Sequence, residues 1–130
     1  MAIVGARDHL GGQVMQVLII LNEPAYANVR PSTALRLPIS LAKSEGVELR
    51  VFLMGDAVTV AKPGQKTPDG YYNLERMLRG CAAKSVAIGA CGTCLDARGM
   101  TDDPLVEGVH RSSMAELTKW TLWADKVITF

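Results

Sequence analysis

Val17-Leu18-Ile19-Ile20-Leu21 is an uninterrupted apolar run near the start of the chain. A run of strand length that is rich in β-branched residues is typical of a strand buried on both faces of a parallel sheet. The run ends at Asn22-Glu23-Pro24, where polar residues and a proline indicate a loop. The sequence therefore predicts a parallel sheet with this segment as a buried strand.

Outward from this strand, apolar segments of strand length alternate with helical patterns. Further strands are predicted at 48–54, 86–90, 109–111 and 126–130, and helices at 32–44, from about 71 to 81 and from Ser113 to about Ala124. This alternation predicts a three-layer α/β/α domain with a mostly parallel sheet of about five strands. Residues 1–14 hold three glycines and no periodicity, so we expect a loose extension ahead of one domain over 15–130.

Three local features refine the helices. Pro38 has no N–H for the Ala34 carbonyl, so a kink or a late start is expected in the first helix. Ser113 and Glu116 form a capping box at the start of the last helix. The middle helix is expected to turn one apolar face to the core, formed by Tyr71, Leu74, Met77, Leu78 and Cys81.

Charge and hydropathy exclude several classes of partner. The chain has 14 basic and 13 acidic residues, a net charge of +1 and no block of like charges. It therefore lacks the electrostatic footprint of a protein that binds nucleic acid or an anionic membrane. No apolar run approaches the roughly 20 residues that span a bilayer, and the first residues are too polar for a secretion signal. We expect a cytoplasmic protein with protein or small-molecule partners.

The apolar content also predicts self-association. Apolar residues make up 48% of the chain, and the mean hydropathy is +0.15, which is high for a small monomer. Some of this apolar surface is expected to be buried between subunits. Trp120, Trp123 and the long polar loop at 62–72 are the candidates, because aromatic residues anchor interfaces and extended loops reach across symmetry axes.

Loops at the carboxyl ends of parallel strands are where sites form, and here they are 22–28, 55–70 and 91–99. The third begins with Cys91-Gly92-Thr93-Cys94. A thiolate is the reactive form of cysteine, and a helix N-terminus or a cation lowers a thiol pKa from about 8.5 to roughly 3.5–7.5. Arg98 is the available cation, Gly92 permits close approach, and Thr93 offers a donor to a sulfur anion.

The same residues also allow structural roles in place of chemical ones. The C-x-x-C pair is alternatively structural, and Cys81 completes an apolar helix face, which predicts a core thiol. Asp96 is alternatively a helix cap. Zinc needs four ligands, and only Cys81, His9 and His110 stand outside the pair, at irregular spacing, so no metal is expected. An odd number of cysteines in a chain that needs no disulfide staple predicts reduced thiols.

Two cofactor or fold alternatives are disfavoured. A flavin or nucleotide site calls for a Gly-rich or Ser/Thr-rich phosphate loop after the first strand, and residues 22–28 contain no glycine. In a thioredoxin-type fold the C-x-x-C follows an early strand and stands at the start of a long helix. Here the pair follows the third strand, and Gly99 interrupts soon afterwards. No cofactor is predicted.

Several separated segments resemble one known family, the DsrE/DsrF-like family, in particular its YchN-like branch. They are Val51-Phe52-Leu53-Met54-Gly55-Asp56-Ala57-Val58, the run from Cys91 to Gly99, the run from Trp120 to Phe130, and Gly64-Gln65-Lys66 in the polar loop. The resemblance covers roughly residues 15–130. It implies a flavodoxin-like α/β/α fold and assembly as a homotrimer or a homohexamer.

The resemblance also implies a function, intracellular sulfur relay, in which a cysteine carries sulfur as a persulfide between donor and acceptor proteins. The family's sulfur-carrying cysteine matches Cys91, with Cys94 as a second thiol. Whether such a carrier acts as a sulfurtransferase-like enzyme stays open. The supporting residues predicted around the pair are Gly92, Thr93, Asp96 and Arg98, together with Asn22, Glu23 and Tyr26 of the first loop. The alternative is a non-catalytic, oligomeric binding or assembly module with a redox-sensitive C-x-x-C.

Overall fold

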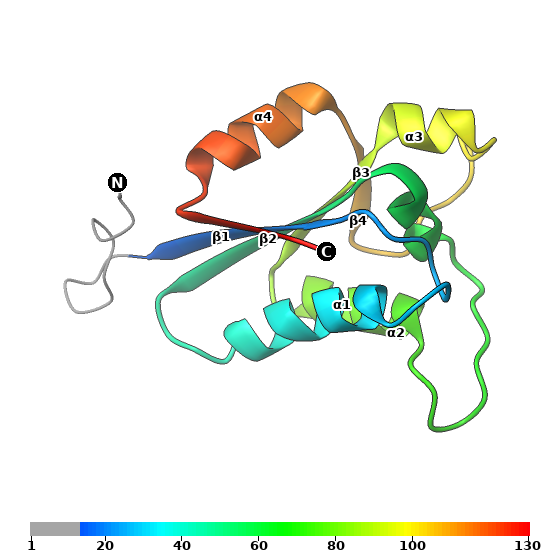
Figure 1. The fold of residues 1–130 in the computed structure, drawn as a ribbon, viewed down its shortest axis with the longest axis horizontal. Helices are drawn as coiled ribbons and strands as arrows, with labels where there is room; N and C mark the ends of the chain where they lie inside the picture. Colours follow the sequence, from blue (N-terminus) through cyan, green and yellow to red (C-terminus); the bar gives the residue numbers. More distant parts are fainter. Residues whose placement is uncertain (1–13) are drawn as a thin grey trace.

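A five-stranded parallel sheet forms the centre of the computed structural model, which describes residues 14–130 (Figure 1). Its strands are β1 (Met15–Leu21), β2 (Val47–Leu53), β3 (Ala87–Cys91), β4 (Val109–Ser112) and β5 (Lys126–Thr129). They lie in the order β4-β3-β2-β1-β5, and all neighbouring pairs are parallel. Flavodoxin-type sheets have the order 2-1-3-4-5, so the likeness to that fold lies in its layers and parallel strands and not in strand order.

Helices cover both faces of the sheet, which confirms the three-layer α/β/α class. The first pair, α1 (Arg30–Leu41) and α2 (Leu74–Ala83), lies on one face, and α3 (Gly92–Ala97) and α4 (Met114–Trp123) lie on the other (Figure 1). Within residues 14–130, no helix is long and apolar enough to cross a membrane. The expected extension over residues 1–14 lies, apart from Val14, outside the described residues.

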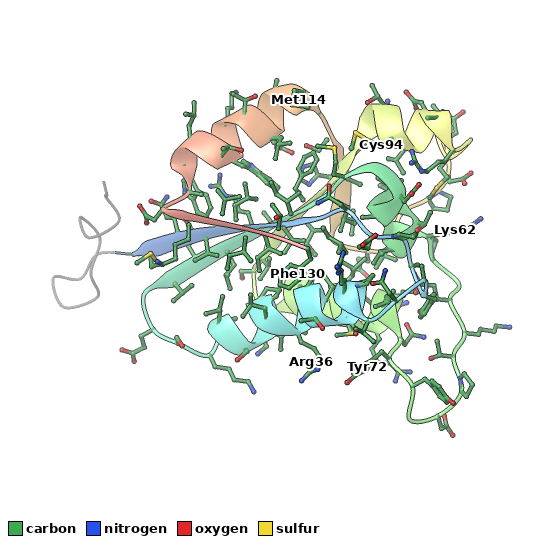
Figure 2. All side chains as sticks on the ribbon, viewed as in Figure 1. Arg36, Lys62, Tyr72, Cys94, Met114 and Phe130 are labelled. Carbon is green, nitrogen blue, oxygen red and sulfur yellow. A yellow bond between two sulfur atoms is a disulfide. The ribbon has the colours of Figure 1, made fainter. Side chains whose placement is uncertain are left out.

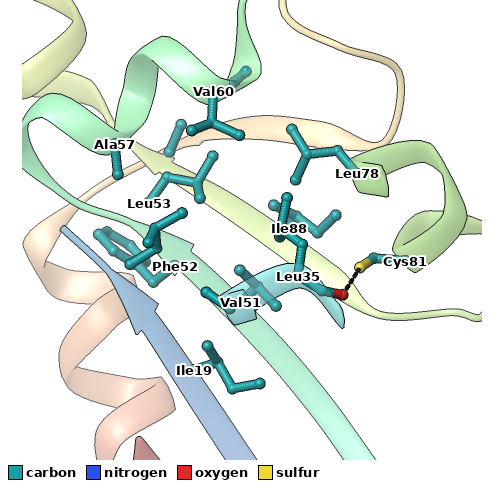
Figure 3. Packing of buried hydrophobic residues seen from close by; sticks show 14 of the residues in the cluster. Ile19, Leu35, Val51, Phe52, Leu53, Ala57, Val60, Leu78, Cys81 and Ile88 are labelled. Atoms are coloured by element: carbon teal, nitrogen blue, oxygen red, sulfur yellow. Dashed lines mark hydrogen bonds between the residues drawn. The ribbon is translucent and has the colours of Figure 1, made fainter. Parts of the chain in front are cut away.

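The core lies where the central strands meet the helices. Leu18, Ile19 and Leu21 of β1 are fully buried, as the continuous apolar run predicts for a strand with a neighbour on each side. Cys81 of α2 is fully buried in the same core, and its thiol donates to the Leu35 carbonyl across 3.7 Å (Figure 3). Burial raises the pKa of this thiol to about 11, so Cys81 is the inert core thiol that the sequence predicts.

The first helix differs from its prediction in where it begins and ends. It starts at Arg30, before the predicted Ser32, and the expected late start at Pro38 is wrong. Pro31 occupies the first turn, where a proline removes no helical hydrogen bond. The hydrogen-bond ladder resumes after Pro38, whose carbonyl accepts from the Ala42 N–H at 2.9 Å. Pro38 is therefore accommodated inside one helix that ends at Leu41.

The expected core face of the middle helix is wrong at its first position. Asn73 is the N-cap of α2, and its side chain accepts from the Arg76 N–H, so the helix begins only at Leu74. Tyr71 precedes the cap and is 73% exposed. The sequence also gave no sign of the short 3-10 helix η2 (Gly55–Ala61), whose buried residues are Ala57, Val58, Val60 and Ala61.

The C-terminal helix begins as predicted, because the Ser113 side chain accepts from the Glu116 N–H. Trp120 of this helix is only 6% exposed and packs edge-on against Phe52, with ring centroids 6.1 Å apart. Its expected place at a subunit interface is therefore wrong, because the ring is already buried within its own chain. Trp123 is half-buried, and the Arg50 guanidinium lies 3.9 Å from its ring centroid.

Candidate functional site

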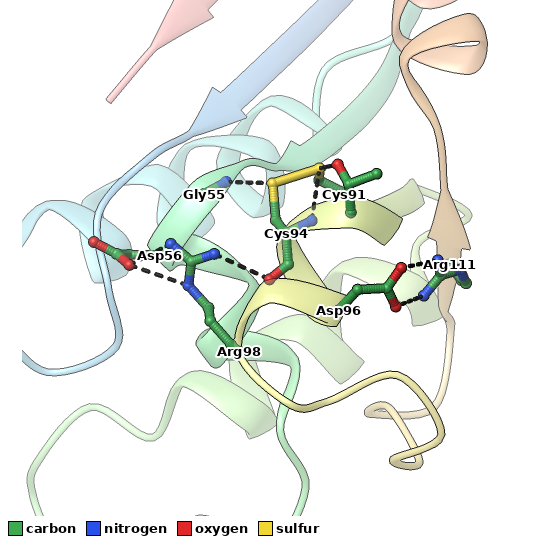
Figure 4. Close-up of a disulfide and its surroundings, with 8 residues drawn as sticks. Gly55, Asp56, Cys91, Cys94, Asp96, Arg98 and Arg111 are labelled. Carbon is green, nitrogen blue, oxygen red and sulfur yellow. Dashed lines mark hydrogen bonds and ion pairs between the residues drawn. A yellow bond between two sulfur atoms is a disulfide. The ribbon is translucent and has the colours of Figure 1, made fainter.

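Cys91 and Cys94 lie together at the carboxyl end of β3. Cys91 is the last residue of the strand, Cys94 lies in the first turn of α3, and a disulfide joins them (Figure 4). The expectation of reduced thiols therefore fails for this pair, because the turn from strand to helix brings their Cα atoms within 5.2 Å. A cross-link between residues so close in sequence restrains little of the unfolded chain, so it contributes little to the stability of the fold.

Three hydrogen-bond donors reach the two sulfur atoms. The Cys94 N–H donates to Cys91 Sγ at 3.3 Å, and the Thr93 hydroxyl lies 3.4 Å from the same atom. The N–H of Gly55, the first residue of η2, donates to Cys94 Sγ at 3.2 Å. Donors of this kind favour the anionic form of the atom that accepts from them. Cys91 is 8% exposed, whereas Cys94 is half-buried, so Cys94 is the more accessible of the two.

Gly92 is the point where the turn touches strand β4. A Cβ atom at this position would lie 2.9 Å from the Ser112 carbonyl oxygen and 2.9 Å from Arg111 Cζ. The close approach that the sequence predicted for this glycine is therefore made to the neighbouring strand. It lets the C-x-x-C turn pack directly against the sheet edge.

Arg98 does not contact sulfur, contrary to its expected role as the cation of the pair. Its guanidinium donates to Asp56 Oδ1 at 2.6 Å and to the Cys94 carbonyl at 3.0 Å (Figure 4). Its charge is therefore matched by a carboxylate. The arginine fastens α3 to η2, and so holds Cys94 near the Gly55 N–H.

Asp96 lies on the other side of α3 and is not a helix cap. The Arg111 guanidinium binds it through two hydrogen bonds of 2.8 and 2.9 Å (Figure 4). This pairing, with a smaller contribution from the Thr101 hydroxyl, lowers the pKa of Asp96 to about 2. α3 is thus tied to β4 by one ion pair and to η2 by the other.

The Asp96 ion pair predicts a pH-dependent contribution to stability. A carboxyl whose pKa is lower in the folded chain stabilises the fold above its unfolded value, and this contribution is lost as the pH falls through the folded value. For Asp96 that window runs from about pH 4 to about pH 2. We expect Asp96→Asn to unfold at lower urea concentration than wild type at pH 7 and at the same concentration near pH 2. An equal difference at both pH values would contradict this account.

The residues predicted from the first loop do not join the cysteines. The Asn22 amide donates to the Phe130 carbonyl at 3.2 Å, and Glu23 pairs with Arg30 at 2.8 Å. The Tyr26 hydroxyl donates to Gln65 Oε1 at 2.5 Å. Tyr26 also lines an open groove of about 540 Å³ between the loop after β1 and the loop before α2. These three residues thus join the loop after β1 to the C-terminal residue, to the start of α1 and to the polar loop.

Sequence reasoning did not single out Gly55, Asp56 or Arg111 as members of this site. The first two lie in the loop at 55–70 that the sequence marked as a candidate, and the pairing of β2 with β3 brings that loop beside Cys91. For Arg111 the sequence carried no signal, because its role depends on β4 lying beside β3. Among the described residues, no cluster of three or more His, Cys, Asp or Glu side chains could hold a metal ion.

Comparison with known proteins gives consistent matches over this whole region. The model of the DsrE/DsrF-like family matches residues 15–130. The Escherichia coli protein YchN is 42% identical over 118 residues, which cover 90% of this chain and all of that protein. An uncharacterised protein of Methanopyrus kandleri is 35% identical over 88% of this chain and 93% of its own length.

Two solved structures share the fold. The crystal structure of the Escherichia coli YchN protein superposes with a TM-score of 0.85, over 90% of this chain and all of that one. A Methanobacterium thermoautotrophicum protein of unknown function, 21% identical, superposes with a TM-score of 0.67 over 89% of this chain and 99% of its own. The second likeness concerns the fold alone.

Proposed function

Because this chain belongs to the DsrE/DsrF-like family, a sulfur-relay family, we propose that it takes part in sulfur relay and carries sulfur as a persulfide on Cys91. In this proposal the Cys91 thiolate attacks the outer sulfur atom of a donor persulfide. The sulfur is then held as Cys91–Sγ–Sδ⁻, and the donor leaves as a thiolate. Donor and acceptor proteins are the partners of the cycle.

The observation that carries this proposal is the convergence of two donors on Cys91 Sγ. The Cys94 N–H and the Thr93 hydroxyl would stabilise the thiolate that must form before sulfur is taken up. Cys94 Sγ receives one donor, the Gly55 N–H. The low exposure of Cys91 also supports a carrier role, since a persulfide there is shielded from oxidants in solution.

A loading experiment tests this function. The Cys94→Ser protein, in which Cys91 is the one thiol left in the C-x-x-C turn, is reduced, freed of reductant without air, incubated briefly with glutathione persulfide and digested for mass spectrometry. We expect one added sulfur atom on the peptide that contains Cys91, and none on the peptide that contains Cys81, because Cys81 is buried and its thiol pKa is raised. If neither Cys94→Ser nor Cys91→Ser ever gains sulfur, the relay function is overturned. The redox-sensitive binding module then becomes the better account of the C-x-x-C.

Assembly as a homotrimer or a homohexamer is a second part of the proposal. The apolar side chains available to an interface are those exposed on the single chain, and these include Tyr71 at 73%, Tyr72 at 53% and Leu122 at 82%. Tyr72 lies beside Arg36, whose guanidinium is 5.8 Å from the ring centroid (Figure 2). Aromatic rings and arginines are enriched at protein interfaces.

We expect light scattering to give a mass of three or six times 14.0 kDa, about 42 or about 84 kDa. Tyr71→Glu should lower this mass by placing a charge in the proposed interface, whereas Lys43→Glu, in the exposed turn after α1, should leave it unchanged. A wild-type monomer at micromolar concentration would rule out the assembly.

A further inference from the structure

The position of Cys94 relative to Cys91 indicates a second reaction at this site. The disulfide shows that Cys94 Sγ reaches bonding contact with Cys91 Sγ without any change of fold (Figure 4). In a Cys91 persulfide this atom is the inner sulfur, to which the carried outer sulfur is attached. We propose that Cys94 attacks this inner sulfur, so that the chain discharges its carried sulfur as hydrosulfide. This inference rests on the sulfur loading of Cys91 proposed above.

The discharge step balances without another reactant. The Cys94 thiolate forms the Sγ–Sγ bond with Cys91, the bond between Cys91 Sγ and the outer sulfur breaks, and that sulfur leaves as HS⁻ with the electron pair of the broken bond. The proton released when Cys94 ionises goes to solvent. The two cysteines are oxidised to the disulfide, and the carried sulfur is reduced from the sulfane state to sulfide. The product is the disulfide that the structure contains.

Contacts from η2 hold Cys94 in place for this attack. The N–H of Gly55, the first residue of η2, donates to Cys94 Sγ at 3.2 Å. Gly55 has a φ of +60°, a backbone conformation that residues with a side chain rarely adopt. Arg98 adds a second restraint by binding both the Cys94 carbonyl and Asp56. A thiolate held in this way reacts at high effective concentration, because little motion separates it from its target.

The disulfide must be reduced before another cycle. The exposed fractions of the two cysteine side chains indicate which sulfur atom the reductant attacks. Cys94 is half-buried and Cys91 is 8% exposed, so an external thiolate meets Cys94 Sγ first. Cys91 then leaves as a thiolate that accepts from the Cys94 N–H and the Thr93 hydroxyl, and a stabilised thiolate is the better leaving group. The second thiol of the reductant resolves the mixed disulfide. With a dithiol as the reductant, the reductant is oxidised to a disulfide while both cysteines return to thiols.

A single-turnover experiment tests the discharge. Reduced wild type, free of reductant and air, receives one equivalent of glutathione persulfide and is desalted at once. We expect it to release one equivalent of sulfide per chain and to lose two thiols, with Cys91 and Cys94 recovered as the disulfide. Cys94→Ser should gain the sulfur and release it at no more than about one hundredth of the wild-type rate, because the intramolecular attack is lost. Cys81→Ala is the matched control and should behave as wild type, since Cys81 lies in the core.

The outcomes separate this inference from the proposed function. Sulfur gained by both wild type and Cys94→Ser, with no faster sulfide release from wild type, overturns the discharge and leaves the relay intact. Sulfur gained by neither protein overturns the relay and the discharge together. Sulfide release from wild type without loss of thiols also overturns the proposed attack, because that attack must form the disulfide. Circular dichroism of Cys94→Ser confirms that its behaviour does not come from unfolding.

Discussion

Cys91→Ser is expected to abolish sulfur loading completely. A serine hydroxyl is not ionised near neutral pH and forms no persulfide. The variant therefore has no atom at this position that can carry sulfur. The fold should persist, because serine is close to cysteine in size. Its hydroxyl can also accept the Cys94 N–H that Cys91 Sγ accepts now, as serine does at helix N-caps. The measurement is the mass of the intact protein after brief exposure to glutathione persulfide.

Cys94→Ser is the matched variant for this prediction. It removes a thiol from the same turn and should retain the sulfur gained, which assigns the carrier role to one of the two positions. Loss of loading in Cys94→Ser together with normal loading in Cys91→Ser would reverse the roles. The greater exposure of Cys94 makes that reversal the main rival of our assignment.

Trp120→Ala is expected to destabilise the fold by about 3–5 kcal/mol, the range for truncating a buried aromatic side chain. The Trp120 ring is 6% exposed and packs edge-on against Phe52 in β2. It also lies 5.9 Å from the His110 ring, and the Arg50 guanidinium is 5.5 Å from its centroid. Alanine would leave a cavity between α4 and the sheet. Such a loss is a large part of the roughly 5–15 kcal/mol that stabilises a typical domain.

Urea denaturation measures this effect, with Lys119→Ala as its control. Lys119 precedes Trp120 on the same helix and is exposed, so its substitution should change the free energy of unfolding by no more than about 0.5 kcal/mol. A loss below about 1 kcal/mol in Trp120→Ala would contradict the role of this ring as the anchor of α4.

Local sequence chemistry determined the elements of the fold. The apolar run at Val17 to Leu21 predicted the buried strand β1, and the pair Ser113 and Glu116 predicted the start of α4. Both signals act within a few residues: the first is a run long enough to be covered on both faces, and the second is a side chain that caps its own helix. The cysteine pair was likewise placed at the end of a strand from its neighbours in sequence, with the strand boundary one residue out.

Local signals failed where a neighbour in space decided the outcome. Pro38 has the same covalent chemistry in a broken and in an intact helix, and packing in the core keeps α1 continuous around it. Tyr71 fits the helical spacing of α2, yet Asn73 caps that helix, which begins only at Leu74. Trp120 is equally suited to a core or an interface, and its contact with Phe52 places it in the core.

The details of the cysteine site were decided by the tertiary structure. Sequence alone supplied Cys91, Cys94, Gly92 and Thr93, because these four residues are consecutive and their turn is local. The Gly55 N–H on Cys94 and the pairing of Arg98 with Asp56 join residues that are 39 and 42 positions apart. Such contacts exist only because β2 and β3 lie side by side, and that order is set by the burial of whole strands and helices, which no short segment encodes.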